Sequence, residues 1–188
     1  MIHGYTAVGN HQVEKLVVPD SRDVAQFIFF EVAAQFEDFA KTMFQMEVRS
    51  KLRVTAKRSC FVMGDLDGGL NNKLGWGSPK LLRERGSNLF GPDSFFGDLM
   101  HEVGEPTYKA LMSAHTVRNR IAHSGGTAQE RFVKLLESDG IASAERQGLS
   151  VGRYLREYPT GSTVNDRHFN RFLTAYETFA ARAEAALP

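Results

Sequence analysis

The chain lacks the cysteines that disulfide frameworks and thiolate metal sites need, and it lacks the long apolar segments of membrane spans. Its 188 residues include one cysteine, Cys60, which excludes an intramolecular disulfide and any zinc site that needs several thiolates. No apolar run approaches the roughly 18 residues that a membrane helix requires, and no charged-then-apolar signal segment opens the chain. We therefore expect a protein of the reducing cytoplasm with no membrane partner. We also expect Cys60 to be buried, as free cysteines commonly are.

The chain also lacks an excess of charge of one sign. Twenty-three Lys and Arg residues stand against 22 Asp and Glu, which leaves a formal net charge of +1. This balance excludes a generally basic coat for nucleic acids. Apolar residues make up 42% of the chain and charged residues 24%. Such a composition is typical of a folded domain with its own core and not of a disordered chain.

The hydrophobic pattern predicts an all-α fold. Apolar residues recur every three or four positions near residues 20–50, 106–124, 127–140 and 166–186, which is the spacing of amphipathic helices. In the first of these helices the repeating positions are Ile28, Val32, Phe36, Phe39 and Met43. The phenylalanines around them widen the apolar face, and we expect them to be core residues.

Helix boundaries follow from capping residues. Asp20 and Ser21 are typical of a helix start, and the pair Gly125 and Gly126 is typical of a helix end. Thr127 is a candidate cap for the next helix. These signals place the first long helix after residue 19 and separate two helices near residue 125.

Two segments lack helical periodicity. Residues 1–19 are interpreted as an N-terminal extension that forms an extended lead-in or a short strand. Residues 59–92 contain seven glycines and two prolines, which indicates a loop-rich insert with at most one short helix, near Lys80–Arg85. The prediction is a single helical domain over residues 1–188, an up-and-down bundle of about four to five main helices with an irregular insert near 59–92.

The segment most informative about function runs from His115 to His123. Residues four apart share a face of a helix, so His115, Asn119 and His123 form a ladder with Arg118 beside it. We expect His123 in the last helical turn, where the site can open to solvent. A permanent cation and a group that titrates near neutrality would then share one exposed edge.

These residue types suit cleavage of an RNA phosphodiester. The reaction needs a base for the 2′-hydroxyl, an acid for the leaving 5′-oxygen and positive charge near the phosphorus. Histidine titrates in the range that such proton transfers require, and arginine can grip phosphate oxygens with two parallel hydrogen bonds. One helix supplies one well-placed terminal histidine, whereas a two-fold dimer supplies two. We therefore expect a homodimer.

Arg118, followed directly by Asn119 and after four intervening residues by His123, resembles the R-x4-H signature of the HEPN superfamily. Members are all-α bundles that usually dimerise, and many are metal-independent endoribonucleases of toxin–antitoxin, abortive-infection or CRISPR-linked defence. The resemblance implies that Arg118, His123 and Asn119 are catalytic, in a cleft between protomers. It also implies that no metal or other cofactor takes part and that the products carry 2′,3′-cyclic phosphate ends. His115 and Arg120 are candidates for supporting roles.

The resemblance also implies partners. The substrate would be RNA, and a cognate antitoxin or regulator protein could bind the enzyme. In the subfamily that pairs with nucleotidyltransferase antitoxins, a tyrosine stands two residues after the histidine. Gly125 stands at that place in this chain, so the resemblance does not extend to that particular partner.

Basic charge is concentrated in one part of this balanced chain. Between Arg49 and Arg85 there are nine basic and three acidic residues, a local net charge of +6, and Phe61 and Trp76 lie in the same stretch. Cations with interleaved aromatic side chains can hold single-stranded RNA through phosphate contacts and stacking. The alternative is an ordinary solvated surface. The candidates for RNA contacts are Arg49, Lys51, Arg53, Lys57 and Arg58.

Three functions stay open on the sequence alone. The favoured one is a metal-independent endoribonuclease of HEPN type that cleaves single-stranded RNA at a dimer interface. The second is a catalytically inactive HEPN-like module that binds a nucleotide or RNA, or serves as a scaffold. The third is an unrelated helical interaction protein. In that case Arg118 is a solvated side chain and His123 is a terminal histidine favoured by the helix dipole, while Asn119 caps a backbone group and His115 packs at an interface.

Overall fold

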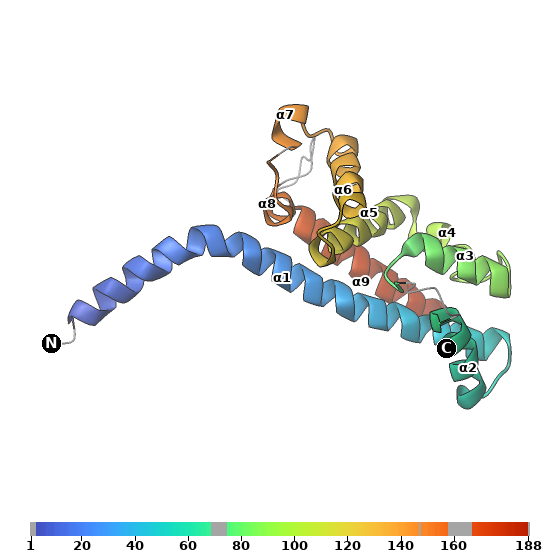
Figure 1. Cartoon of the computed structure of the whole chain (residues 1–188). Helices are drawn as coiled ribbons and strands as arrows, with labels where there is room; N and C mark the ends of the chain where they lie inside the picture. Colours follow the sequence, from blue (N-terminus) through green and yellow to red (C-terminus); the bar gives the residue numbers. More distant parts are fainter. Residues whose placement is uncertain (1–2, 69–74, 147, 158–166, 188) are drawn as a thin grey trace. The chain divides into compact units, whose positions relative to one another are not determined.

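The computed structural model describes residues 3–68, 75–146, 148–157 and 167–187 (Figure 1). All regular secondary structure in these residues is helical, which confirms the predicted all-α class. None of the helices in these ranges combines the length and the hydrophobicity that crossing a bilayer requires. The helices are α1 (His3–Lys51), α2 (Ala56–Gly68), α3 (Pro79–Phe90), α4 (Leu99–Val103), α5 (Glu105–Ala122), α6 (Gly126–Ser138), α7 (Ser143–Arg146), α8 (Val151–Arg156) and α9 (His168–Ala186).

The helical bundle has two compact units, and each is assembled from segments that are distant in the sequence. The first unit contains Met1–Glu31 and Val117–Asn170. The second unit contains Val32–Thr116 and Arg171–Pro188. Helices α1, α5 and α9 each contribute residues to both units.

The core of the second unit is built largely from aromatic rings. Phe36 of α1 stacks on Tyr176 of α9 with ring centroids 4.2 Å apart, and the two helices lie side by side there (Figure 1). Phe44 is fully buried, and its ring centroid lies 4.9 Å from that of Phe96 and 5.3 Å from that of Trp76. Such aromatic pairs contribute about 0.5–1.5 kcal/mol each beyond the burial of their area.

A buried carboxylate in the second unit holds the loop that precedes α4. Glu47 of α1 is fully buried, and its carboxylate accepts hydrogen bonds from the backbone N–H groups of Phe95 at 2.8 Å and Phe96 at 3.2 Å. One turn later, Nζ of Lys51 donates to the carbonyl oxygen of Asp93 at 3.1 Å. Burial raises the pKa of Glu47, although the backbone hydrogen bonds from Phe96 and Phe95 and the charge of Lys51 act to lower it.

The first unit contains a polar cluster within its core. The fully buried Tyr154 of α8 donates its hydroxyl to Asp139 at 2.5 Å, and its ring stacks on that of His168 with centroids 4.1 Å apart. Nδ1 of His168 lies 3.9 Å from the Asp139 carboxylate. The ring of Phe132 meets Tyr154 edge-on at 5.6 Å. The cluster therefore ties the end of α6 to α8 and to the start of α9.

Helix α1 begins earlier than predicted. The sequence predicts a start at Asp20 after an extended or strand-like segment, whereas the backbone is helical from His3. That prediction was wrong, and the helix contains Gly4, Gly9 and Pro19, three residues that weaken a helix without ending this one. A glycine costs a helix about 1 kcal/mol and a proline about 3 kcal/mol, and neither ends a helix when its neighbours favour helical structure.

The buried face of α1 also differs in part from the predicted one. Phe36 and Met43 are buried as expected, but Phe27 is 66% exposed and Ile28 is 46% exposed. The assumption that every phenylalanine of this helix is a core residue was therefore wrong. The buried stripe instead runs through Phe29, Ala33, Phe36, Ala40, Met43, Phe44 and Val48.

The structure corrects the prediction of an irregular insert at 59–92. Helices α2 and α3 occupy most of the described residues of this segment, and residues 69–74 lie outside the described residues. The short helix expected near Lys80–Arg85 is present as α3. Gly86 lies within α3 and does not break the helix. A Cβ at this position would lie 2.5 Å from the backbone carbonyl carbon of Phe96. The glycine is needed for close packing.

Other boundaries shift by a few residues. The four longest predicted helices are observed as α1, α5, α6 and α9. Helix α6 begins at Gly126 with Gly125 as its N-cap, so Thr127 is not the cap. Helix α4 begins at Leu99, with Asp98 as its N-cap. The last predicted helix, near residues 166–186, is observed as α9 from His168, and residue 166 lies outside the described residues.

Candidate functional site

The last turns of α5 carry Arg118 and Asn119 next to each other in space. The buried Val117 anchors this part of the helix in the first unit, and both polar side chains are half-buried. Nη1 of Arg118 donates to Oδ1 of Asn119 at 3.4 Å. The guanidinium carbon of Arg118 lies 5.4 Å from the ring centroid of Phe30, a cation–π distance. Two neighbours therefore hold the arginine, and its charge is permanent.

His123 lies just beyond the end of α5, and its side chain is exposed. Two hydrogen bonds fix its backbone. Its N–H donates to the carbonyl oxygen of Asn119 at 3.0 Å, and its carbonyl oxygen accepts from Nη1 of Arg120 at 3.1 Å. The side chain of His123 is thus exposed to solvent, while hydrogen bonds to Asn119 and Arg120 fix its backbone.

The candidate supporting residues have different surroundings. Arg120 contributes through its hydrogen bond to the backbone of His123, which satisfies a carbonyl group at the end of α5. His115 is half-buried in the second unit, where its Cε1 lies 4.0 Å from the position that a Cβ would take on Gly75. The ladder predicted along α5 thus has two helical members, while His123 stands past the last helical residue.

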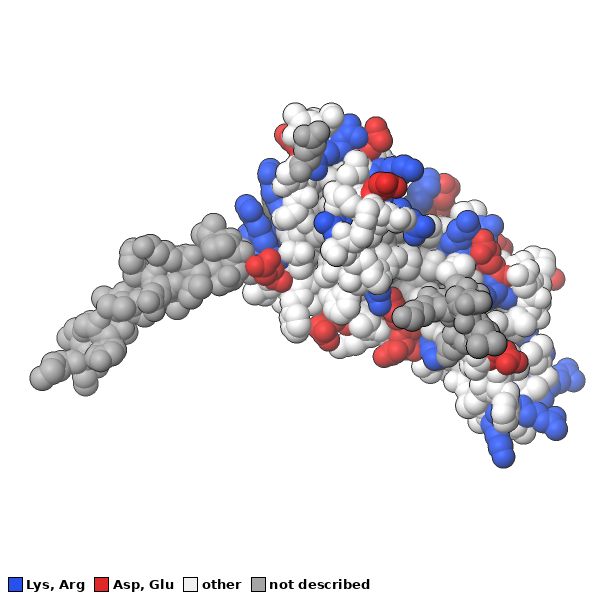
Figure 2. Space-filling model, viewed as in Figure 1, with Lys and Arg blue, Asp and Glu red and all other residues white. Residues whose placement is uncertain are grey.

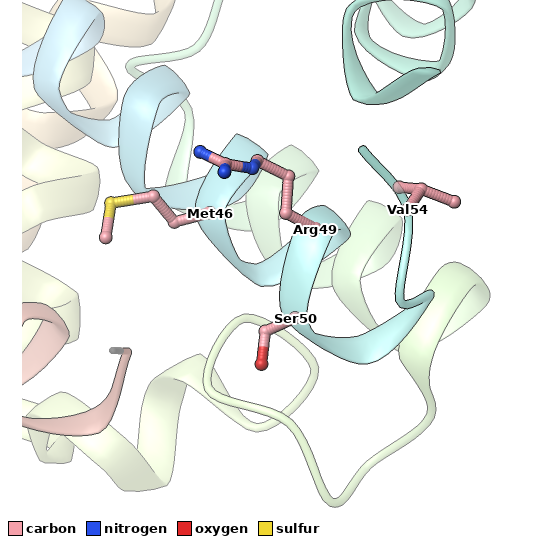
Figure 3. A pocket seen from close by; sticks show the side chains of 4 residues that line it. All are labelled: Met46, Arg49, Ser50 and Val54. Atoms are coloured by element: carbon pink, nitrogen blue, oxygen red, sulfur yellow. The ribbon is translucent and has the colours of Figure 1, made fainter. Parts of the chain in front are cut away.

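Two surface hollows can be described, and neither is lined by the predicted catalytic residues. One has a volume of about 320 Å³ and is lined by Met46, Arg49, Ser50 and Val54. Figure 3 shows that Met46, Arg49 and Ser50 project from the end of α1 and that Val54 comes from the segment after it. The other, of about 360 Å³, lies in the first unit among residues of α1, α8 and the start of α9.

All five candidate RNA-contacting residues are exposed at the junction of α1 and α2. Figure 2 shows Lys and Arg side chains gathered over α2 and the end of α1. Among these five residues, Lys51 donates a hydrogen bond from its ammonium group to the backbone carbonyl oxygen of Asp93. Within the part of the chain that the structure describes, the other four form no ion pair. They are Arg49, Arg53, Lys57 and Arg58.

The two aromatic residues of the basic segment differ sharply. Trp76 is only 6% exposed, and the guanidinium carbon of Arg85 lies 4.3 Å from its ring centroid. Its predicted availability for stacking on RNA was therefore wrong, because the aromatic core of the second unit takes up this ring. Phe61 is 69% exposed and remains available.

The lone cysteine is exposed, so the expectation that Cys60 is buried was wrong. Ser59, the preceding residue of α2, takes the buried position, and Sγ of Cys60 accepts a hydrogen bond from Nε2 of Gln45 at 3.4 Å. Among the described side chains, no group of three or more His, Cys, Asp or Glu residues is arranged to hold a metal ion.

Comparison of the chain with protein-family models, with curated proteins and with solved structures found no match.

Proposed function

We propose that this chain is an endoribonuclease of HEPN type in which Arg118, His123 and Asn119 act on an RNA phosphodiester. The observation that supports the proposal is the arrangement at the end of α5. Arg118 donates to Asn119 at 3.4 Å, and one turn later the exposed His123 stands on a backbone held by hydrogen bonds to Asn119 and Arg120. A fixed cation and a solvent-accessible imidazole therefore lie on neighbouring turns.

The chemistry follows from these groups. A neutral imidazole accepts the proton of the 2′-hydroxyl while the 2′-oxygen attacks phosphorus. The bond from phosphorus to the 5′-oxygen breaks, and an imidazolium gives its proton to this leaving oxygen. Arg118 stabilises the negative charge that builds up on the phosphate oxygens, and Asn119 positions the guanidinium. The products are a 2′,3′-cyclic phosphate and a 5′-hydroxyl end.

The proposed enzyme is a homodimer. One protomer offers a single exposed histidine at the end of α5, whereas the reaction uses one proton acceptor and one proton donor. A two-fold axis beside the end of α5 would supply the second histidine and a second arginine from the partner subunit. A biological role as a toxin or defence effector, with an antitoxin or regulator protein as partner, belongs to the same proposal and comes from the resemblance.

The experiment is cleavage of single-stranded RNA by the purified protein in excess EDTA, with the ends of the products identified. We expect cleavage by the wild type and its loss in Arg118→Ala and in His123→Ala. His101→Ala and Arg131→Ala are matched controls, since both residues are exposed and lie outside the site. Cleavage that persists in Arg118→Ala or His123→Ala would remove these residues from the mechanism.

A second candidate is a module that binds RNA or a nucleotide without cleaving it. The observation that favours it is the seating of Arg118, whose contacts with Phe30 and Asn119 would also suit a purely structural arginine. Binding of RNA with no cleavage at any pH from about 5 to 9 would select this function over the nuclease.

A further inference from the structure

The cations at the junction of α1 and α2 are all exposed, and we call them the basic patch, which we define as Arg49, Lys51, Arg53, Lys57 and Arg58. From Val48 to Gly64 the chain contains these five cations and no acidic residue. Arg49 also lines the hollow of about 320 Å³ at the end of α1 (Figure 3). The patch is therefore a strong local source of positive potential on a nearly neutral protein.

The backbone at Arg53 is unusual. Its φ of 50° makes it the one non-glycine residue with a left-handed backbone in the described part of the chain. The N–H of Val54 donates to the carbonyl oxygen of Arg49 at 3.2 Å, the bond that closes a helix through a left-handed residue. Glycine is favoured at this position because a Cβ is strained there. This chain instead places a cation at the strained position.

The cations of α2 also stand where local electrostatics disfavour them. Lys57 and Arg58 are the second and third residues of α2, and the first turn contains no acidic residue. The amino end of a helix carries partial positive charge, so cations there are destabilising. Within six residues the chain therefore has a non-glycine residue with a left-handed backbone, Arg53, and two cations at the amino end of a helix, both of which are unfavourable. A bound polyanion would offset the electrostatic cost of the cations.

An exposed aromatic ring lies on the same surface. Phe61 follows Lys57 by four residues and Arg58 by three, so the three side chains share one face of α2. The opposite face is buried through Ser59 and Met63, while the ring of Phe61 is 69% exposed. Gly64, three residues further along this face, has no atom within 4 Å of the position its Cβ would take. The ring therefore has open space beside it and cations next to it.

We infer that the basic patch and Phe61 together bind single-stranded nucleic acid. One base stacks on the ring of Phe61, and Lys57 and Arg58 contact the flanking phosphates, with Arg49 and Arg53 extending the track. Lys51 takes a smaller part because it already holds Asp93. A duplex hides its base faces and would leave the ring unused, whereas a single strand uses both the ring and the charges. The inference goes beyond the proposed cleavage, because it concerns binding in the second unit alone.

The test measures binding of a fluorescent thymidine deoxyoligonucleotide of about a dozen nucleotides to the full chain by anisotropy over a salt series. This probe lacks a 2′-hydroxyl, so the proposed cleavage cannot consume it. We expect Phe61→Ala to weaken binding by about fivefold to a hundredfold with an unchanged salt slope. Arg58→Ala and Lys57→Ala should each reduce the slope of log K against log salt by about 0.7.

Controls separate stacking from other effects. Phe61→Tyr keeps a ring and should retain binding, whereas Phe61→Leu keeps an apolar side chain without a ring and should bind as weakly as Phe61→Ala. Phe27→Ala removes a phenylalanine of similar exposure on α1 outside the patch and should bind like the wild type. Unchanged helical circular dichroism of Phe61→Ala would show that its fold is intact.

Three results would overturn the inference. The first is equal binding by Phe61→Ala and the wild type, and the second is restored binding in Phe61→Leu. The third is binding to phosphatidylserine vesicles with none to the oligonucleotide, which would make the patch a membrane-surface site. His123→Ala should bind the oligonucleotide normally. Loss of RNA cleavage and loss of oligonucleotide binding are therefore separable failures.

Discussion

Replacing Glu47 tests how the second unit holds the loop before α4. Its carboxylate serves two buried backbone donors, the N–H groups of Phe95 and Phe96. Glu47→Gln keeps the shape but offers one acceptor oxygen, so one buried N–H loses its partner, which costs about 1–3 kcal/mol. With a urea m-value of about 2 kcal/mol/M, the midpoint should fall by roughly 0.5–1.5 M.

The measurement is urea unfolding at pH 7, followed by circular dichroism. Glu84→Gln is the matched control, since Glu84 pairs with Lys80 on the exposed surface of α3 and such pairs contribute only about 0–1 kcal/mol. Glu47→Ala leaves both N–H groups without an acceptor and should lower the midpoint further. A midpoint for Glu47→Gln equal to that of Glu84→Gln would refute the structural role of this carboxylate.

The pH dependence of the free energy of unfolding that Glu47 contributes has a definite sign. Burial raises the pKa of Glu47 above its ordinary value of 4.5. The folded state therefore holds the proton more tightly than the unfolded state, and stability falls as pH rises from about 4.5 through the raised pKa. Glu47→Gln lacks this titration. The stability difference between the wild type and Glu47→Gln should thus be larger near pH 4.5 than at pH 7, and a difference that grows with pH would contradict this reasoning.

Three further outcomes are expected. Arg53→Gly should raise the free energy of unfolding by about 1 kcal/mol, because glycine relieves the left-handed strain; a loss of stability in urea melts would contradict this. Gly86→Ala should destabilise by about 1–3 kcal/mol, because its Cβ meets the backbone of Phe96, whereas Gly64→Ala, in open space, should stabilise by about 0.5–1 kcal/mol.

Much of the fold could be predicted because helical periodicity records burial directly. The apolar spacing predicted α5, α6 and α9, and each of these helices has buried apolar residues, among them Leu111, Phe132 and Phe179. The errors arose where one residue type has two uses. Glycine marks loops but also permits close packing, which is its part at Gly86. Phenylalanine usually marks the core, yet Phe61 is largely exposed.

The candidate site could be predicted only along one helix. The spacing of Arg118, Asn119 and His123 is readable because the three are close in the sequence. The seating of Arg118 against Phe30 is not, because that contact joins residues far apart in the chain. The same limit applies to the buried cluster around Tyr154, which no local pattern reveals.

Contacts between residues far apart in the chain also explain why Trp76 is buried and Cys60 is exposed. Local composition shows that both lie in a basic segment, but only the packing of the second unit decides which side chains face solvent. Trp76 is drawn into the aromatic core around Phe44, whereas the buried face of α2 uses Ser59 and leaves its neighbour Cys60 outside.

The most direct test of the central claim is the chemical nature of the RNA ends left by the protein in EDTA. If Arg118 and His123 perform the reaction, the wild type leaves 2′,3′-cyclic phosphate and 5′-hydroxyl ends, and neither Arg118→Ala nor His123→Ala yields them. Identical ends from either variant, or intact RNA after incubation with the wild type across the neutral pH range, would contradict the account.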